Sequence, residues 1–270
     1  MTQAKEAIIG VRATLALATL GLLGTTAYVR MSATESPPLK LYYWPFFGRA
    51  GAIIRMLDFS NTKFEWVSVN KKEEFMALLS ARARSYSPVN GTCNSCDTFA
   101  PPVVVDGEVV LSQSIAVAMY VGDKVGLGDS VPSVYKAVQY MNDINDFSGE
   151  ATAAALSGAK TLKVFIEGGR MQAWLANIEH SIQGPFYFGD KASYVDFQLL
   201  HAMDISIDDA FLTSLMPTLE KRKIAHPLAQ RPKIHMLLTK LRSQPWYHAE
   251  HEYPFNIPAY RMKPGEIAAY

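Results

Sequence analysis

Residues 39–69 read LKLYYWPFFGRAGAIIRMLDFSNTKFEWVSV, and this stretch decides the fold class. Leu39 to Trp44 alternates weakly in polarity, is rich in aromatic residues and ends at Pro45, which predicts a strand followed by a turn. Arg49 to Phe59 has apolar residues at helical spacing, and Phe64 to Val69 alternates again as a second strand. A strand, a helix and a strand in this order predict a parallel pair joined by a helix.

The chain from residue 75 to residue 126 completes a small sheet. It has a short helical pattern from Phe75 to Arg84 and a longer one from Ser114 to Val125. Between them lie two short strands, Val103 to Val105 and Val109 to Leu111, on either side of the turn Asp106-Gly107. A two-residue aspartate-glycine turn is typical of a hairpin. The sheet is therefore predicted to be mixed, with parallel pairing at its front, a hairpin at its back and helices on its faces.

The chain after Asp129 carries helical patterns. They cover Val134 to Ser148, Leu162 to Ile182, Tyr194 to Met203 and Pro232 to Ser243. Ser193 and Asp196 have the spacing of a capping box at the start of the third of these helices. We therefore predict an α/β domain over residues 39–126 and an all-helical domain over residues 127–270.

Residues 1–38 comprise an apolar segment and a short polar linker. Ala13 to Val29 is uncharged, and extension back to Ile8 gives about twenty-two residues, enough to cross a bilayer, with Arg12 inside the span. A cleaved secretory or mitochondrial targeting peptide and a buried helix are the alternatives. We predict an N-terminal apolar helix that is retained and anchors the protein through residues 8–29 in a mitochondrial membrane or an endomembrane. The flanking charges leave its orientation undecided.

The composition argues against two kinds of partner. The chain of 270 residues has 26 Lys and Arg against 25 Asp and Glu, so it lacks the basic field that holds a nucleic-acid backbone. Cys93 and Cys96 cannot make a disulfide framework, and the histidines, which all lie at or beyond His180, do not complete a zinc site with them. We expect neither a nucleic-acid partner nor a metal.

Four motifs together resemble the cytosolic-type glutathione transferases of the tyrosine-type classes, which are sigma, pi, mu and alpha-like. The motifs are YWPFFGR (43–49), APPVVVDG (100–107), LSQS (111–114) and FGDKASYVD (188–196). The resemblance covers nearly all of the chain from Leu39 to about Tyr247 and rests on the order and spacing of the motifs. It implies a thioredoxin-like N-terminal domain followed by the all-helical transferase C-terminal domain.

The resemblance also implies a set of site residues. Tyr43 would be the catalytic residue, because a phenol O–H aimed at the sulfur of glutathione favours the thiolate over the thiol. The residues implied in glutathione binding are Tyr43, Arg49, Lys72, Pro102, Val103, Gln113 and Ser114. Lys71 and Lys72 are equal candidates to contact the glycine carboxylate of the tripeptide.

Physical reasons support three of these assignments. Pro102, implied to follow a cis peptide bond, would leave the main chain of Val103 free to pair with glutathione as an added strand. Ser114 begins a helix, whose free N–H groups and dipole favour the γ-glutamyl carboxylate next to Gln113. Structural alternatives stay open: Tyr43 packed in an aromatic cluster, the proline pair stiffening a loop, Ser114 as an ordinary N-cap and Arg49 in a solvated ion pair.

The resemblance implies glutathione as co-substrate and a homodimer or a larger membrane complex. The first hypothesis is a detoxifying transferase whose thiolate attacks apolar electrophiles or reduces peroxides. The alternatives are a catalytically idle transferase-fold subunit tethered to a membrane assembly and a glutathione-dependent isomerase. Candidates to line a second-substrate pocket are Tyr135, Tyr140, Phe147, Tyr253 and Phe255.

The sequence departs from the family in the loop from Ser85 to Ala100, which is longer than the resemblance implies. This loop contains Cys93 and Cys96 at the spacing of a redox motif. A thioredoxin-type nucleophile would instead lie directly after the first strand, where residues 45–49 contain no cysteine. We expect a loop disulfide or two inert thiols.

Overall fold

The computed structural model describes residues 38–67, 73, 100–207, 226–249 and 252. Within these residues a four-stranded sheet has the order β2-β1-β3-β4. Its strands are β1 (Leu39–Tyr42), β2 (Phe64–Val67), β3 (Val103–Asp106) and β4 (Val109–Ser112). β1 runs parallel to β2, whereas β3 runs antiparallel to both β1 and β4. The predicted mixed sheet is confirmed.

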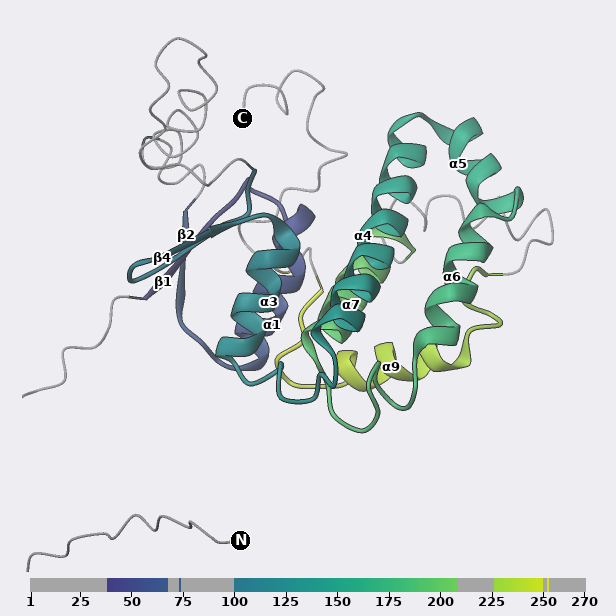
Figure 1. The fold of residues 1–270 in the computed structure, drawn as a ribbon. Coiled ribbons are helices and arrows are strands. Elements are labelled where there is room, and N and C mark those ends of the chain that lie inside the picture. The colour runs from purple at the N-terminus through teal and green to yellow at the C-terminus, as the bar shows by residue number, and fades with distance from the viewer. Residues whose placement is uncertain (1–37, 68–72, 74–99, 208–225, 250–251, 253–270) are drawn as a thin grey trace, which may run out of the picture. The chain divides into compact units, whose positions relative to one another are not determined.

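Two helices cover one face of this sheet. A 3-10 turn, η1 (Gly48–Ala50), leads into α1 (Gly51–Phe59), which connects β1 to its parallel neighbour β2. The hairpin of β3 and β4 leads into α3 (Ser114–Lys124). Figure 1 shows α1 and α3 side by side on the same face, where they pack against each other.

The alternation of side chains along β1 separates two apolar clusters. Leu39, Leu41 and Tyr43 belong to the main core, together with the buried residues of α1 and α3. Tyr42 lies with Val67 and Val103 in a second, smaller cluster. Successive residues of a strand point to opposite faces, so the two adjacent tyrosines have different surroundings.

The rest of the described chain is helical. It contains α4 (Val134–Leu156), α5 (Ala159–Glu167), α6 (Arg170–Ser181), α7 (Tyr194–Ser206) and α9 (Pro232–Arg242). α7 packs along both α1 and α4 and is almost wholly buried, which makes it the central helix (Figure 1). A thioredoxin-like sheet followed by helices is the predicted fold class.

Several predicted boundaries were wrong, the longest error being α4, which continues to Leu156 and not to Ser148. The hairpin turn consists of Gly107 and Glu108, one residue later than predicted, because Asp106 pairs with Val109. The single helix predicted from Leu162 to Ile182 is two helices, which are separated at Gly168 and Gly169. Gly169 has a φ of 84°, a conformation that glycine adopts without steric cost, so the backbone turns there.

Several predictions concern residues outside the described part of the chain. They are the apolar segment 8–29, the helix from Phe75 to Arg84, the loop with Cys93 and Cys96, and the candidates Lys71, Lys72, Tyr253 and Phe255. In the ranges that are described, no helix combines the length and the apolar character needed to span a bilayer.

The start of α7 is held by a capping box. The Asp196 carboxylate accepts hydrogen bonds from the N–H and the hydroxyl of Ser193, each at 2.7 Å. It also accepts one from the N–H of Tyr187, again at 2.7 Å, so it links α7 to the preceding turn. Burial raises the pKa of Asp196 to about 6, against the opposite effect of these hydrogen bonds.

This pKa predicts a specific pH dependence of stability. At pH values below its unfolded pKa, Asp196 is protonated and its contribution to the stability of the folded state is fully present. This contribution is lost as the pH rises through the folded pKa of about 6. Compared with Asp196→Asn, the wild-type protein should therefore lose up to about 3 kcal/mol of unfolding free energy between pH 4 and pH 7. Urea unfolding of both proteins across this range measures the difference, in which other titrating groups cancel. If the wild-type protein instead gained unfolding free energy relative to Asp196→Asn as the pH rises, the hydrogen bonds would outweigh burial.

Candidate functional site

Tyr43 directly follows β1, at the end of the sheet where α1 begins. Its N–H donates to the carbonyl of Val67 at 3.2 Å, which extends the pairing with β2 by one residue. The ring makes edge contacts with Phe46 and Trp66, with centroids 5.7 Å and 6.3 Å away. Tyr43 is only 4% exposed and packs among aromatic rings, of which Phe46 belongs to the YWPFFGR motif and Trp66 to β2.

The hydroxyl of Tyr43 nevertheless has a polar partner. It accepts a hydrogen bond of 2.7 Å from the main-chain N–H of Arg49. The backbone can approach this closely because residue 48 is glycine: a Cβ there would lie 2.5 Å from the hydroxyl oxygen, and the φ of Gly48 is +40°. In the described part of the chain the hydroxyl proton itself has no acceptor, so it can be donated to a ligand.

The Tyr43 phenol stays protonated near neutral pH. Burial raises its pKa to about 12, although the N–H and the charge of Arg49 act to lower it. A neutral phenol can donate a hydrogen bond to a ligand, but it does not act as a base that removes a proton. The side chain of Arg49 is exposed, so the structure uses the backbone of this residue to hold Tyr43.

The candidates from the second and third motifs lie at the same end of the sheet. Val103, the first residue of β3, is in register with Tyr42 on one side and Ser112 on the other. The peptide bond before Pro102 is cis, as the resemblance implied. Because β3 is an interior strand, a peptide can reach Val103 only at the end of the strand and not along a free edge.

Gln113 and Ser114 open α3 beside this strand end. The N–H of Gln113 donates to the carbonyl of Ala100 at 3.1 Å, which ties the helix start to the segment before the proline pair. Gln113 has a φ of 77° and is the N-cap, while Ser114 is the first helical residue. Ser114 is therefore not the N-cap itself, and its N–H is one of the free donors of the helix N-terminus.

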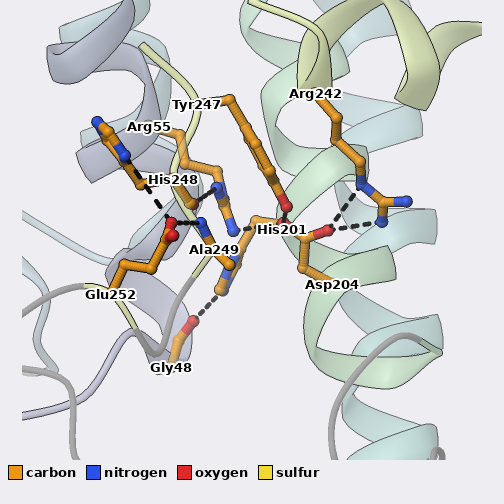
Figure 2. A network of polar contacts seen from close by, with 9 residues as sticks. All are labelled: Gly48, Arg55, His201, Asp204, Arg242, Tyr247, His248, Ala249 and Glu252. Atoms are coloured by element: carbon orange, nitrogen blue, oxygen red, sulfur yellow. Dashed lines mark hydrogen bonds and ion pairs between the residues drawn. The ribbon is translucent and has the colours of Figure 1, made fainter. Parts of the chain in front are cut away.

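A group of polar residues around a buried ion pair, absent from the predictions, joins α1 to the C-terminal helices. Arg55 on α1 forms an ion pair with Asp204 on α7. Arg242 on α9 donates to the other oxygen of Asp204 at 2.6 Å and 3.2 Å, and the hydroxyl of Tyr247 donates to the carboxylate at 3.3 Å. We call these four residues the Asp204 cluster; Figure 2 shows them converging on the carboxylate.

Arg55 makes three further contacts. It donates to the carbonyl of His248 at 3.2 Å, and its guanidinium lies over the rings of Phe47 and Tyr247, with 5.5 Å and 5.0 Å to the centroids. Its side chain is fully buried. The signal in the sequence was a charge inside an apolar run, IIRML (53–57), opposite a second one in LLHAMDI (199–205).

His201 on α7 reaches the loop next to Tyr43. Its Nε2 is hydrogen-bonded to the carbonyl of Gly48, a contact drawn in Figure 2. The ring packs against Gly51, where an added Cβ would lie 2.6 Å from Nε2 and nearer still to two other ring atoms. Gly51 therefore allows α7 to approach the start of α1 closely.

Comparison with solved structures finds proteins of similar fold. The Pi-class glutathione S-transferase of Onchocerca volvulus is 19% identical, with a TM-score of 0.55 over 77% of this chain and 89% of its own. Rat hPGDS in complex with a quinoline is 17% identical, with a TM-score of 0.54 over 78% and 93%. Prostaglandin synthase D of Nilaparvata lugens is 18% identical, with a TM-score of 0.52 over 82% and 100%.

The chain has the glutathione transferase fold. No protein-family model and no curated protein sequence matches the chain. Because many functions can share one fold, the function of this glutathione transferase fold has to be argued from its site residues.

Three of the candidates for a second-substrate pocket lie in the described part of the chain, all on α4, and their surroundings differ. Phe147 is fully buried in the core, whereas Tyr135 is 85% exposed. Tyr140 stacks on Tyr187 and Phe188, with centroids 5.2 Å and 5.9 Å away. Tyr140 and Phe147 are therefore packing residues, and Tyr135 lies on the surface.

Proposed function

We propose that the protein is a glutathione transferase in which Tyr43 is the catalytic residue. The observation that supports this most is the state of the Tyr43 hydroxyl. It is buried, protonated, fixed by the N–H of Arg49 and free, among the described residues, to donate its proton. A fixed O–H donor suits the stabilisation of an anion that forms next to it.

The anion in this proposal is the thiolate of glutathione. A free thiol has a pKa of about 8.5, so only about 3% is ionised at pH 7. A hydrogen bond from Tyr43 is stronger to the thiolate than to the thiol and lowers the thiol pKa. A decrease of the thiol pKa to about 7 would ionise about half of the bound glutathione at neutral pH. The site would then have to bind the thiolate about 2 kcal/mol more tightly than the thiol.

The neighbouring residues would hold the rest of the tripeptide. The first free N–H groups of α3, with the hydroxyl of Ser114, would bind the γ-glutamyl carboxylate at the positive end of the helix dipole. The cysteinyl residue would lie against the end of β3 at Val103, since both sides of this strand are already paired. The start of α3 and the end of β3 at Val103 both lie at the end of the sheet that carries Tyr43, which supports these roles.

The reaction then follows from a bound thiolate. Its sulfur forms a bond to an electrophilic carbon of an apolar substrate, the leaving group departs with its electron pair, and the thiol proton passes to solvent. A peroxide would instead be reduced at the expense of two glutathiones. The alternative of an idle subunit on a membrane rests on residues 8–29, which lie outside the described residues.

Glutathione titration of the full chain tests the proposal. Calorimetry should detect binding at millimolar glutathione or below, and the ultraviolet absorbance of the bound thiolate should give a thiol pKa at least about one unit below 8.5. S-Methylglutathione should bind but show no such titration. Conjugation of a chromogenic chloronitrobenzene should follow the same pKa. Absence of binding at several millimolar would remove the proposal.

Ser114 provides a test of the binding part alone. Loss of a hydrogen bond to a charged group costs about 1.5–3 kcal/mol, so Ser114→Ala should weaken glutathione binding about tenfold or more. The pKa of bound thiol should not change, because the hydroxyl acts on the other end of the tripeptide. Ser133→Ala, at the N-cap of α4, is the matched control and should keep the wild-type affinity. Equal affinities of the two variants would contradict the assignment of Ser114.

A further inference from the structure

One peptide unit connects His201 to the Tyr43 hydroxyl. The carbonyl of Gly48 accepts from His201 Nε2, and the N–H of Arg49 donates to Tyr43 at 2.7 Å. These two groups belong to the same planar amide, with the C=O at one end and the N–H at the other. The unit therefore has a side chain of α7 on one side and the candidate catalytic hydroxyl on the other.

The geometry fixes which atom carries the proton. A carbonyl oxygen accepts and cannot donate, so Nε2 of His201 must be the protonated nitrogen. The imidazole is 3% exposed, and its ring lies 6.1 Å from that of Phe47. The ring packs directly against the backbone of Gly51, where an added Cβ would overlap it.

We propose that His201 is a positioning residue for Tyr43, acting through the amide between Gly48 and Arg49. A donor on the carbonyl polarises an amide and makes its N–H a stronger donor, because hydrogen bonds in a chain reinforce one another. A stronger bond from the Arg49 N–H fixes the Tyr43 oxygen and makes its own O–H a better donor. This inference rests on the proposed function of Tyr43 and extends it to the helical part of the chain.

The arrangement also gives α7 a direct effect on the thiol site. α7 packs along α1, and the contact from His201 to Gly48 lies where α1 begins. A shift of α7 relative to α1 would change the length of this contact. The reactivity of the bound thiol would then depend on the packing of the two helices.

Two variants of His201 separate this role from simple packing. His201→Gln keeps an N–H donor near the position of Nε2, whereas His201→Leu has a similar volume and no donor. His201→Leu should raise the pKa of bound glutathione thiol and lower kcat about threefold to tenfold, with little change in KM for glutathione. His201→Gln should recover most of this loss. Met203→Ala, at another fully buried position of α7, should lower stability without moving the thiol pKa.

A measurement without glutathione gives an independent readout. The amide proton resonance of Arg49 reports the strength of its bond to Tyr43. It should move upfield in His201→Leu, move upfield further in Tyr43→Phe, and lie near its wild-type position in His201→Gln and Met203→Ala. An unchanged Arg49 resonance in His201→Leu would overturn the inference.

The outcomes also separate this inference from the proposed function. If neither Tyr43→Phe nor His201→Leu changes the pKa of bound thiol, the proposed function is wrong. If Tyr43→Phe raises that pKa and His201→Leu does not, only the role of His201 is wrong. If His201→Gln loses as much activity as His201→Leu, the ring matters for packing and not as a donor, which also overturns the inference.

Discussion

Replacement of Tyr43 by phenylalanine is expected to lower kcat/KM for glutathione conjugation about 100-fold while glutathione still binds. The phenyl ring keeps the contacts with Phe46 and Trp66, so the local packing survives. The change removes the O–H that would stabilise the thiolate, and the pKa of bound thiol should rise by about two units. The N–H of Arg49 loses its acceptor, which costs about 1 kcal/mol of stability.

Tyr42→Phe is the matched control for this experiment. Tyr42 is adjacent in the sequence but packs with Val67 and Val103 in the other cluster. Loss of its hydroxyl should leave both the turnover and the thiol pKa near the wild-type values. Stopped-flow conjugation and ultraviolet titration of bound glutathione measure both quantities. If Tyr43→Phe turns over as fast as Tyr42→Phe, Tyr43 is a packing residue, as the alternative interpretation of the aromatic motif had it.

Replacement of Asp204 by leucine is expected to lower the free energy of unfolding by about 3–5 kcal/mol. The fully buried guanidinium of Arg55 would then lack a counter-ion. A buried charge without a partner costs far more than an ion pair contributes, because it has lost its hydration. Urea unfolding of Asp204→Leu and the wild-type protein measures the loss.

A double variant shows whether the loss of unfolding free energy comes from the charge of Arg55 that is left without a counter-ion. Arg55→Met combined with Asp204→Leu removes both members of the ion pair and should be more stable than Asp204→Leu alone. Lys163→Met is the surface control, because its ion pair with Glu167, at 3.5 Å, is solvent-exposed and should contribute less than about 1 kcal/mol. A loss in Asp204→Leu as small as that in Lys163→Met would show that the Asp204 cluster does not stabilise the fold.

The local elements were predictable because each depends on neighbours in the sequence. The alternation from Leu39 and the helical spacing before Phe59 gave β1 and α1 with one end of each correct and the other within two residues. Ser193 and Asp196 are three residues apart and make their capping contacts as that spacing suggests. The break at Gly168 and Gly169 was missed because apolar residues continue at helical spacing across it, although a glycine pair is a helix-ending signal.

The sequence by itself determined the order of strands and helices, the fold class and the place of Tyr43 at the end of the first strand. Only the tertiary structure decided which residues meet across the molecule. His201 lies 153 residues after Gly48, and Asp204 lies 149 residues after Arg55. Periodicity shows which face of a helix is buried, but the partner on the facing helix depends on how the two helices pack. Beside Tyr43, Gly51 at the start of α1 and His201 on α7 set that packing.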